Sequence, residues 1–296
     1  MVSSSRSEIN HTSTPGQQLR RRALRHWGLM IGSALLGLIV LIALFAPFIA
    51  PHDPYAQDLT LRYLRVAFMG GTWEHPLGTD HLGRDYLSRL LYGARISLTI
   101  GLVAALISGT IGTILGVTAG YFGGRVDTVV MFIITVRLSM PVVLVALAVV
   151  ALFGGSLTVV VLVLGFLLWD QFAVVMRTST QQIRSQDYVT SARALGCSTT
   201  RIIMTEIMPN VFNNMIVVIT LEMAHAIILE AALSFLGLGV QPPLPSWGLM
   251  IAEGKDMLFF EPFLITIPGL ALFILIFAIN MLGDGVRDVT APENRN

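Results

Sequence analysis

Three ionisable residues stand inside one long apolar stretch in the second half of the chain. Glu222, His225 and Glu230 lie within the run from about Val211 to Leu236, and at 100° per residue they occupy one broad side of a helix. Ionisable groups inside a membrane span often mark an ion or substrate pathway, so a proton or cation relay is one hypothesis. We favour the alternative that these side chains form hydrogen bonds between helices, over direct contact with a substrate.

The same three residues are a poor ligand set for a metal. One His and two Glu on a single helix do not match the usual zinc sites, and the metalloprotease pattern H-E-x-x-H is absent from the sequence. An intramembrane metalloenzyme is therefore the weakest of the functions considered, and we expect no catalytic residues and no metal.

Nucleotide chemistry is also unsupported. Lys255 is the only lysine among the 19 basic residues, and Asp256 follows it. A phosphate-binding P-loop requires G-x-x-x-x-G-K-[ST]. We therefore expect that the chain is not an enzyme, has no ATPase site and binds no cofactor. The single cysteine, Cys197, excludes a disulfide within the chain.

The composition indicates a membrane protein with several spans. The 296 residues are 54% hydrophobic and 12% charged, whereas soluble domains carry about 25% charged residues. The net charge of +1 and the lack of a basic patch with interleaved aromatic residues give no reason to expect a nucleic-acid partner.

Long apolar runs predict an all-α fold with six transmembrane helices and both termini in the cytoplasm. The predicted organisation is a tail 1–27, a first helix 28–50, an outer segment 51–95, a core 96–283 that includes the inner loop 177–212 and the outer loop 238–262, and a tail 284–296. In this orientation 12 basic residues lie inside and 6 outside, in agreement with the positive-inside rule. The first part of the N-terminal tail is expected to be disordered.

Small and charged residues predict how some of these helices pack. Residues with small side chains recur every four positions in the second span, which predicts close approach of another helix to Ser108, Gly112, Gly116 and Gly120. The third span, about 128–153, contains Arg137, and the fourth contains Asp170. An Arg137–Asp170 pair needs both groups at similar depth, and we favour the alternative in which they do not pair.

The outer segment ends in a charged stretch. Asp80, Arg84 and Asp85 are more consistent with a structural ion-pair cluster than with a binding site. The stretch 85–96 has apolar residues at helical spacing, so we expect it to lie along the membrane surface.

The stretch 187–210 is the longest mixed polar segment between two strongly apolar runs. Its pattern predicts a short helix, a break at Gly196, a second short helix capped by Ser198 or Thr199, and a stop at Pro209. Gly196 is expected in a left-handed conformation or where a partner approaches closely. We call this segment the knuckle.

The knuckle resembles the "EAA" loop of ABC importer permeases. Thr190, Ser191 and Ala192 stand at the triplet positions, and Gly196 and Pro209 at the Gly and Pro positions. The acidic residue of the family pattern is absent. Further segments are similar to dipeptide/oligopeptide/nickel permeases of the second type, namely 76–97, 233–247 and 280–288.

The resemblance implies a type I ABC importer permease fold in the bacterial inner membrane. It also implies several partners: a homologous second permease, two cytoplasmic ATPases that use ATP and Mg²⁺, and a periplasmic substrate-binding protein. In such a complex the knuckle couples the ATPases to the spans, which assigns a coupling role to Ser191, Ala192, Arg193, Gly196, Arg201, Ile202 and Pro209. Apolar side chains around Ile202 and Ile203 are expected to dock in the ATPase, and Arg193 or Arg201 to pair with acidic groups there.

The substrate and the energy source stay open between several hypotheses. Peptides are the expected cargo, with nickel or an opine-like solute as the alternative. An ion-coupled secondary transporter is the alternative from a different class, with Glu222, His225 and Glu230 as its proton or cation relay. In the permease the same three residues are the candidates for the translocation path.

Overall fold

The computed structural model describes residues 22–290, and within this part all regular elements are helical. The predicted disorder of the N-terminal tail falls largely outside the described residues. The principal helices are α2 (Trp27–Ile49), α3 (Tyr86–Phe122), α4 (Gly124–Leu138), α5 (Val142–Phe153), α6 (Leu157–Leu167), α7 (Trp169–Arg184), α8 (Asp187–Ala194), α9 (Thr199–Arg201), α10 (Met208–Phe235), α11 (Trp247–Gly254) and α12 (Phe263–Thr290).

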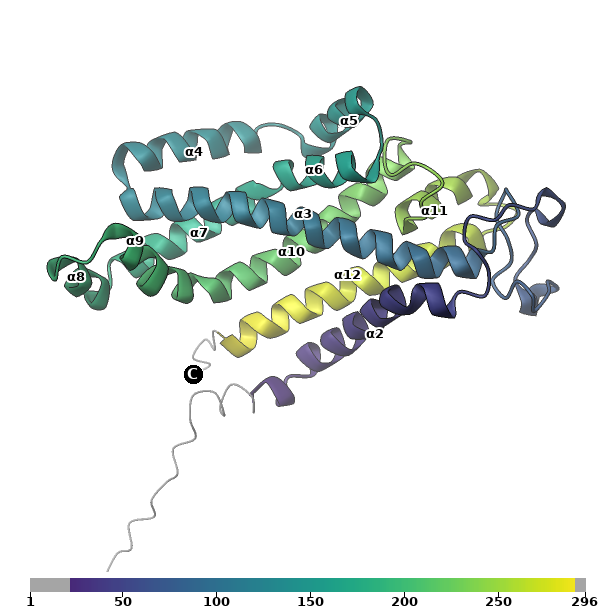
Figure 1. The fold of residues 1–296 in the computed structure, drawn as a ribbon, viewed down its shortest axis with the longest axis horizontal. Helices are drawn as coiled ribbons and strands as arrows, with labels where there is room; N and C mark the ends of the chain where they lie inside the picture. The colour runs from purple at the N-terminus through teal and green to yellow at the C-terminus, as the bar shows by residue number, and fades with distance from the viewer. Residues whose placement is uncertain (1–21, 291–296) are drawn as a thin grey trace, which may run out of the picture.

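Four short helical turns complete the described part of the chain. Three are 3₁₀ turns, η1 (Leu59–Leu61), η2 (Ala67–Met69) and η4 (Lys255–Met257), and one is a π-helical segment, η3 (Ile202–Ile207). Figure 1 shows an elongated bundle with α8 and α9 at one end and α11 with the loops of the outer segment at the other.

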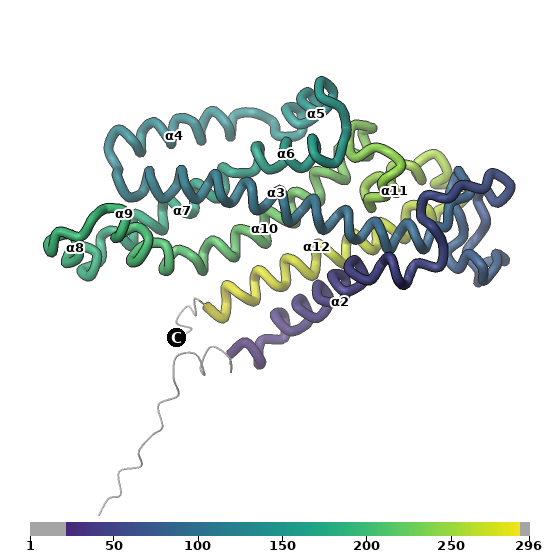
Figure 2. The backbone as a smooth tube through the Cα atoms, in the orientation of Figure 1, coloured from purple at the N-terminus to yellow at the C-terminus, as the bar shows by residue number. Residues whose placement is uncertain are grey.

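Five helical segments are long and apolar enough to cross a membrane, one of them made of α6 and α7 with a break at Leu168, and a bent pair supplies a sixth. The five are Trp27–Ile49, Tyr86–Phe122, Leu157–Arg184, Thr199–Phe235 and Phe263–Thr290. The predicted all-α fold with six membrane helices is confirmed with one difference, because the predicted third span is broken. Helices α4 and α5 meet at an angle of 80° around Ser139–Pro141, and the sharp turn between them is visible in Figure 2.

Two further predictions of helix boundaries are wrong. The stretch 85–96 is the first part of α3 and continues without a break into the span, so it forms no separate surface helix. Pro209 does not stop a helix, because the segment Thr199–Phe235 is continuous. The wider turns of η3 explain this: the Met208 N–H donates to the Ile203 carbonyl five residues earlier, and such a bulge relieves the clash that a proline ring causes in a regular helix.

Helix α3 lies at the centre of the bundle and packs along α7 through its glycines. A Cβ on Gly112, Gly116 or Gly120 would lie 2.3, 2.5 or 2.6 Å from a carbonyl oxygen of α7, so only glycine allows this approach. The predicted packing face is therefore confirmed. On the other side of the bundle α2 and α12 lie side by side, and the His26 ring is 3.1 Å from the Asp288 carboxylate.

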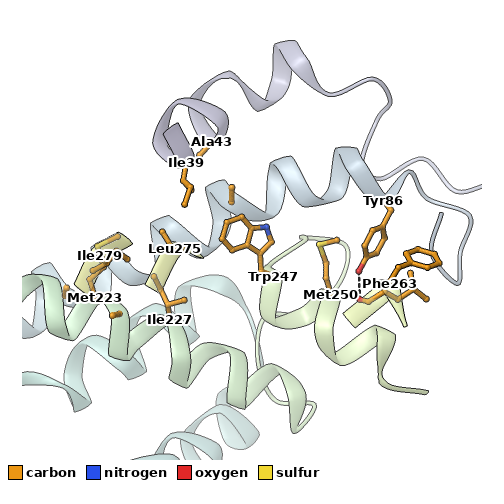
Figure 3. Close-up of a cluster of buried hydrophobic side chains, with 14 of the residues drawn as sticks. Ile39, Ala43, Tyr86, Met223, Ile227, Trp247, Met250, Phe263, Leu275 and Ile279 are labelled. Atoms are coloured by element: carbon orange, nitrogen blue, oxygen red, sulfur yellow. Dashed lines mark hydrogen bonds between the residues drawn. The ribbon is translucent and has the colours of Figure 1, made fainter. Parts of the chain in front are cut away.

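An apolar cluster joins α2, α3, α10, α11 and α12 near the outer end of the bundle. Trp247 lies at its centre and donates from its indole N–H to the Leu90 carbonyl at 2.9 Å. The Tyr86 hydroxyl donates to the Leu264 carbonyl at 2.5 Å, as Figure 3 shows. This cluster fixes the outer loops on the ends of the spans.

Candidate coupling and transport site

The knuckle is built around a helix end that requires glycine. Helix α8 closes with two backbone bonds, from the Gly196 N–H to the Arg193 carbonyl at 3.0 Å and from the Cys197 N–H to the Ala192 carbonyl at 3.1 Å. This pair of bonds is the Schellman motif, in which the residue after the helix is left-handed. Gly196 has φ = +77°, so its predicted left-handed conformation is confirmed. The Ser198 hydroxyl then accepts from the Arg201 N–H at 3.4 Å and caps the next helix as predicted.

The inner face of the knuckle is part of the core of this chain. Val189, Ile202 and Ile207 are buried against Tyr121 of α3 and Met176 of α7. The prediction that Ile202 docks in a partner protein is therefore wrong for its side chain. The helical turn that contains Ile202 is amphipathic, and its apolar face packs on the end of the bundle. This packing holds the knuckle in place.

The outer face presents a different set of apolar residues. Leu195, directly before the turn at Gly196, is 83% exposed, and Met204 is 64% exposed. Neither was singled out from the sequence, although the position of Leu195 beside a left-handed glycine was a usable signal. Arg201 is exposed, and the Arg193 guanidinium lies over the Tyr121 ring at 5.6 Å. Of the other predicted coupling residues, Ser191 and Pro209 are exposed and Ala192 is half-buried.

The three ionisable residues of α10 do not form one site. The Glu222 carboxylate is buried and lies 3.5 Å from the half-exposed His225 ring, and its Oε2 has no hydrogen-bond partner within residues 22–290. Glu230 is separate, because its Oε1 accepts from the hydroxyls of Ser234 and Ser246, each at 2.8 Å. The bond to Ser246 fixes the loop before α11, so the favoured structural role holds for Glu230, whereas Glu222 and His225 contact each other on one helix.

A groove beside α10 adds a feature that the sequence did not indicate. It has a volume of about 280 Å³ and lies between α3 and the first half of α10. Its walls include Gly109 and Thr113 of α3 and Met215 of α10. Thr113 lies in the wall of this apolar groove, and its buried hydroxyl is without a hydrogen-bond partner in the described part of the chain.

The bend in the third span positions a partly buried cation. Arg137, at the end of α4, donates from Nε to the Leu167 carbonyl at 2.8 Å, and its Nη2 lies 3.9 Å from the Asp170 carboxylate. The favoured alternative without a pair is therefore wrong. Helix α6 ends at Leu167, so Asp170 belongs to the first turn of a new helix, and the break after α4 brings Arg137 to the same junction.

A buried charge network connects the outer segment to α11. The Arg84 guanidinium bonds the Asp80 carboxylate at 2.7 Å and Glu253 at 3.1 Å, and Arg89 bonds both carboxylates, that of Glu253 at 2.7 Å. The predicted structural cluster is confirmed for Asp80 and Arg84. Asp85 has a different role, because it caps α3 by accepting from the Ser88 N–H at 2.8 Å.

The charges of this network and the burial of Asp80 shift the pKa of its carboxyl in opposite directions. Burial raises the pKa of the Asp80 carboxyl, but the guanidiniums of Arg89 and Arg84 and two backbone N–H groups lower it, and the net pKa is below its ordinary value. Asp80 is therefore ionised at neutral pH and balances the buried cations. Glu253 was missed in the sequence because it lies 169 positions from Arg84, and without Glu253 the sequence did not single out Arg89 as a member of the network.

Membrane-length helices around a central glycine-rich helix, with a helical knuckle on one end, define a polytopic α-helical membrane protein. The chain belongs to the family of binding-protein-dependent transport system inner membrane components, which matches residues 112–296. Residues 14–65 match the N-terminal TM domain of oligopeptide transport permease C.

Individual proteins of known name are similar along nearly the whole chain. The chain is 38% identical to the di/tripeptide transport system permease protein DppC of Pseudomonas aeruginosa (strain UCBPP-PA14), over 91% of this chain and 89% of that one. It is 36% identical to the dipeptide transport system permease protein DppC of Haemophilus influenzae, over 95% of each. It is also 36% identical to the glutathione transport system permease protein GsiD of Pectobacterium atrosepticum, over 95% of this chain and 92% of that one.

A solved structure supports the same fold. The MetNI methionine ABC transporter in an inward-facing conformation contains a chain that superposes with a TM-score of 0.57 at 16% identity, over 69% of this chain and 97% of that one. The fold is that of a type I ABC importer permease, as the resemblance implied.

Proposed function

We propose that this chain is the membrane subunit of an ATP-driven importer of short peptides in the bacterial inner membrane. The support for peptides comes from the similar proteins, whose names give di- and tripeptides, dipeptides and glutathione as cargo. Nickel or an opine-like solute is the alternative cargo of the same machinery. The cargo would be delivered by a periplasmic binding protein and would pass between this chain and a homologous second permease.

The energy for transport would come from two separate cytoplasmic ATPase subunits. The only lysine of the chain is followed by Asp256, which is incompatible with a P-loop. ATP and Mg²⁺ are therefore assigned to those subunits, and this chain is assigned no enzymatic activity and no nucleotide of its own.

The observation that carries the coupling role is the outward face of the knuckle. Leu195 is 83% exposed beside the left-handed Gly196, while Val189 and Ile202 fix the same segment on α3 and α7. An exposed apolar tip on a firmly anchored base is suited to insertion into a cleft of an ATPase. Ser191, Arg193 and Arg201 would surround this tip, and a rim charge mainly tunes orientation and association rate.

A translocation path along α10 fits the remaining polar groups. The buried Glu222 and its neighbour His225 form one part of this path, and the Thr113 hydroxyl in the nearby groove adds a polar group on α3. Glu230 is excluded from direct substrate contact in this proposal, because both of its hydrogen bonds are made inside the protein.

Substitutions at the tip of the knuckle test the coupling role. Leu195→Asp and Gly196→Asp should each reduce dipeptide uptake at least tenfold and reduce the amount of ATPase that co-purifies with the chain, because a desolvated apolar anchor contributes about 2 kcal/mol or more to binding. Leu195→Met should retain uptake, and Thr72→Asp, an exposed change at the other end of the molecule, is the matched control. Full uptake and a full complement of ATPase in Gly196→Asp would exclude the knuckle as the coupling element.

The alternative function is an ion-coupled transporter, and the observation that favours it is the contact between Glu222 and His225. The energy source of uptake distinguishes the two functions. In proteoliposomes that contain the whole complex, uptake should require ATP and should persist when a protonophore abolishes the proton gradient. Uptake that is driven by the gradient without ATP would establish the ion-coupled alternative. If nickel salts, but not dipeptides, competed with the labelled cargo for uptake, the cargo would be nickel instead of peptide.

A further inference from the structure

Two histidines and a glutamate come together at the outer end of the bundle, apart from the knuckle and from α10. His52 follows the end of α2, and Glu74 and His75 lie in the loop before α3. One ligand atom from each of the three residues can be chosen so that all lie within 4.8 Å of one another. We propose that they bind a divalent transition-metal ion of the Zn²⁺ class, as a resident ion that joins these segments.

A buried carboxylate prepares His75 for this role. Asp85 is 1% exposed, and its Oδ1 is 2.9 Å from the His75 Nδ1. An ionised carboxylate only accepts hydrogen bonds, so Nδ1 carries the proton and the lone pair is on Nε2. This is the carboxylate–histidine–metal arrangement in which the second carboxylate fixes the tautomer and the orientation of the ligand.

The His52 ring lies near the same Asp85 carboxylate but forms no hydrogen bond with it. Its Nδ1 is 3.7 Å from the Asp85 Oδ1, which is too long for a hydrogen bond. This buried nitrogen has no partner within the described range of the chain. The His52 and His75 rings are 4.6 Å apart between their centroids, so a small rotation of His52 can direct a nitrogen to the same ion as His75.

The backbone around the three residues is already ordered. The His52 N–H donates to the Ser88 hydroxyl at 3.1 Å, and a bridge between Thr79 and Asp85 closes the turn that follows His75. Glu74 is exposed and can change its rotamer. Ligand atoms around a tetrahedral zinc are about 3.3 Å apart at the usual bond lengths, so closing the site requires movement of the free Glu74 carboxylate rather than of the backbone.

The ligand chemistry selects the class of ion. Two imidazoles and one carboxylate are suited to Zn²⁺, Ni²⁺ and similar ions, whereas Mg²⁺ and Ca²⁺ prefer oxygen ligands alone. Three protein ligands leave one position for water. A second group of possible ligands, Asp80, His81 and Glu253, lies in the same region. Its carboxylates are bound by two buried guanidiniums, whose positive charges disfavour another cation there.

Direct metal binding tests the proposal without any measurement of transport. The purified complex that contains this chain is stripped with a chelator and titrated with ZnCl₂ against a chromophoric competitor. We expect the complex to bind one Zn²⁺ tightly and to lose this binding when the proposed ligands of this chain are mutated. Binding of the ion should raise the Tm of the complex. Glu74→Gln and His52→Gln should weaken the binding at least tenfold, and Asp85→Asn, which can still cap α3, should weaken it about 10- to 100-fold.

Two histidines elsewhere serve as controls. His26→Gln, at the opposite end of α2, and His81→Gln, in the competing group, should leave the affinity unchanged. Loss of binding in His81→Gln with full binding in Glu74→Gln would overturn the proposal in favour of the competing group. Ordinary structural sites are saturated at a free Zn²⁺ concentration that a chelator buffer can set. If the wild-type complex bound no Zn²⁺ at 100 times that concentration, the proposal would be overturned entirely.

Discussion

At the scale of single residues, the fully buried charges lie mainly at the outer end of the molecule. Asp80 is bound by two guanidiniums and two backbone N–H groups, and it is only 2% exposed. Its presence in a charged stretch predicted an ion pair. The sequence could not identify Glu253 as the second acid, because nothing in a local pattern reports a contact between α11 and the start of α3.

Asp80→Asn should destabilise the protein strongly at neutral pH. The variant keeps the shape of the side chain but leaves Arg84 and Arg89 with one carboxylate between them, and breaking a buried ion pair costs about 3 kcal/mol or more. Asp256→Asn, a change at an exposed acid in η4, is the matched control and should have little effect. The measurement is the Tm of the detergent-solubilised chain, and an Asp80→Asn chain that melts with the wild type would contradict the role of the network.

The pH dependence of this stabilisation has a definite sign. The folded-state pKa of Asp80 lies below its ordinary value of 3.8, so the network contributes fully above about that pH and its contribution is lost as the pH falls through the lower, folded-state pKa. The difference in Tm between wild type and Asp80→Asn should therefore be constant at neutral and mildly acidic pH and should shrink only below about pH 4. A difference that disappears already at pH 6 would refute this assignment.

At the scale of elements, the contact between α3 and α7 depends on residues without side chains. The carbonyl of Ala173 would be 2.5 Å from a Cβ on Gly116, so the two backbones pack at the closest distance that glycine permits. The four-residue repeat made this contact predictable from the sequence. The identity of the opposing helix was not predictable, because α7 carries no matching stripe of small residues.

Gly116→Leu should separate α3 from α7 and reduce the amount of folded protein. Overpacking of a tight core costs about 1–3 kcal/mol, and at this position the obstacle is a backbone that cannot move aside. Gly37→Leu on α2 is the matched control, because no described atom lies within 4 Å of a Cβ placed there. Size-exclusion profiles and melting curves of the solubilised chains would measure the effect, and equal behaviour of the two variants would show that the contact is not critical.

The break between α4 and α5 marks a limit of prediction from the sequence. Apolar residues flank Ser139–Pro141 on both sides, so hydropathy reports a single span and is insensitive to the 80° change of direction. The buried position of Ile202 shows a related limit. An amphipathic pattern identifies an apolar face, but it does not distinguish burial inside the chain from burial against a partner.

At the scale of the whole molecule, the chain is an α-helical membrane subunit whose two ends have different character. One end carries the knuckle, and the other carries the outer segment with its charge network and its histidines. The lengths of the apolar runs were sufficient to predict the number of spans. The orientation in the membrane rests on the excess of basic residues at the knuckle end.

Cysteine labelling should confirm that the knuckle end is cytoplasmic. Cys197 is first replaced by Ser, since it lies in the knuckle and is only partly buried. Single cysteines are then introduced at the exposed positions Ser185, Thr72 and Gln241. An impermeant thiol reagent added to intact cells should modify the last two and leave Ser185→Cys unlabelled until the membrane is permeabilised. Labelling of Ser185→Cys in intact cells would reverse the orientation and remove the basis of the coupling role.

The continuity of α3 has a mechanical consequence. Its 37 residues contain no proline, and at 1.5 Å per residue they form a stiff rod about 55 Å long. One end begins at the capping residue Asp85 beside the histidines, and the other carries Tyr121, which contacts Arg193 of the knuckle. If the rod pivots at its midpoint, a sideways push of about 5 Å on the knuckle end corresponds to a tilt of about 10° and moves the other end by about 5 Å. Helix α3 can therefore act as a lever that spans the entire membrane, so that a small rotation at one surface moves the opposite surface by several ångströms.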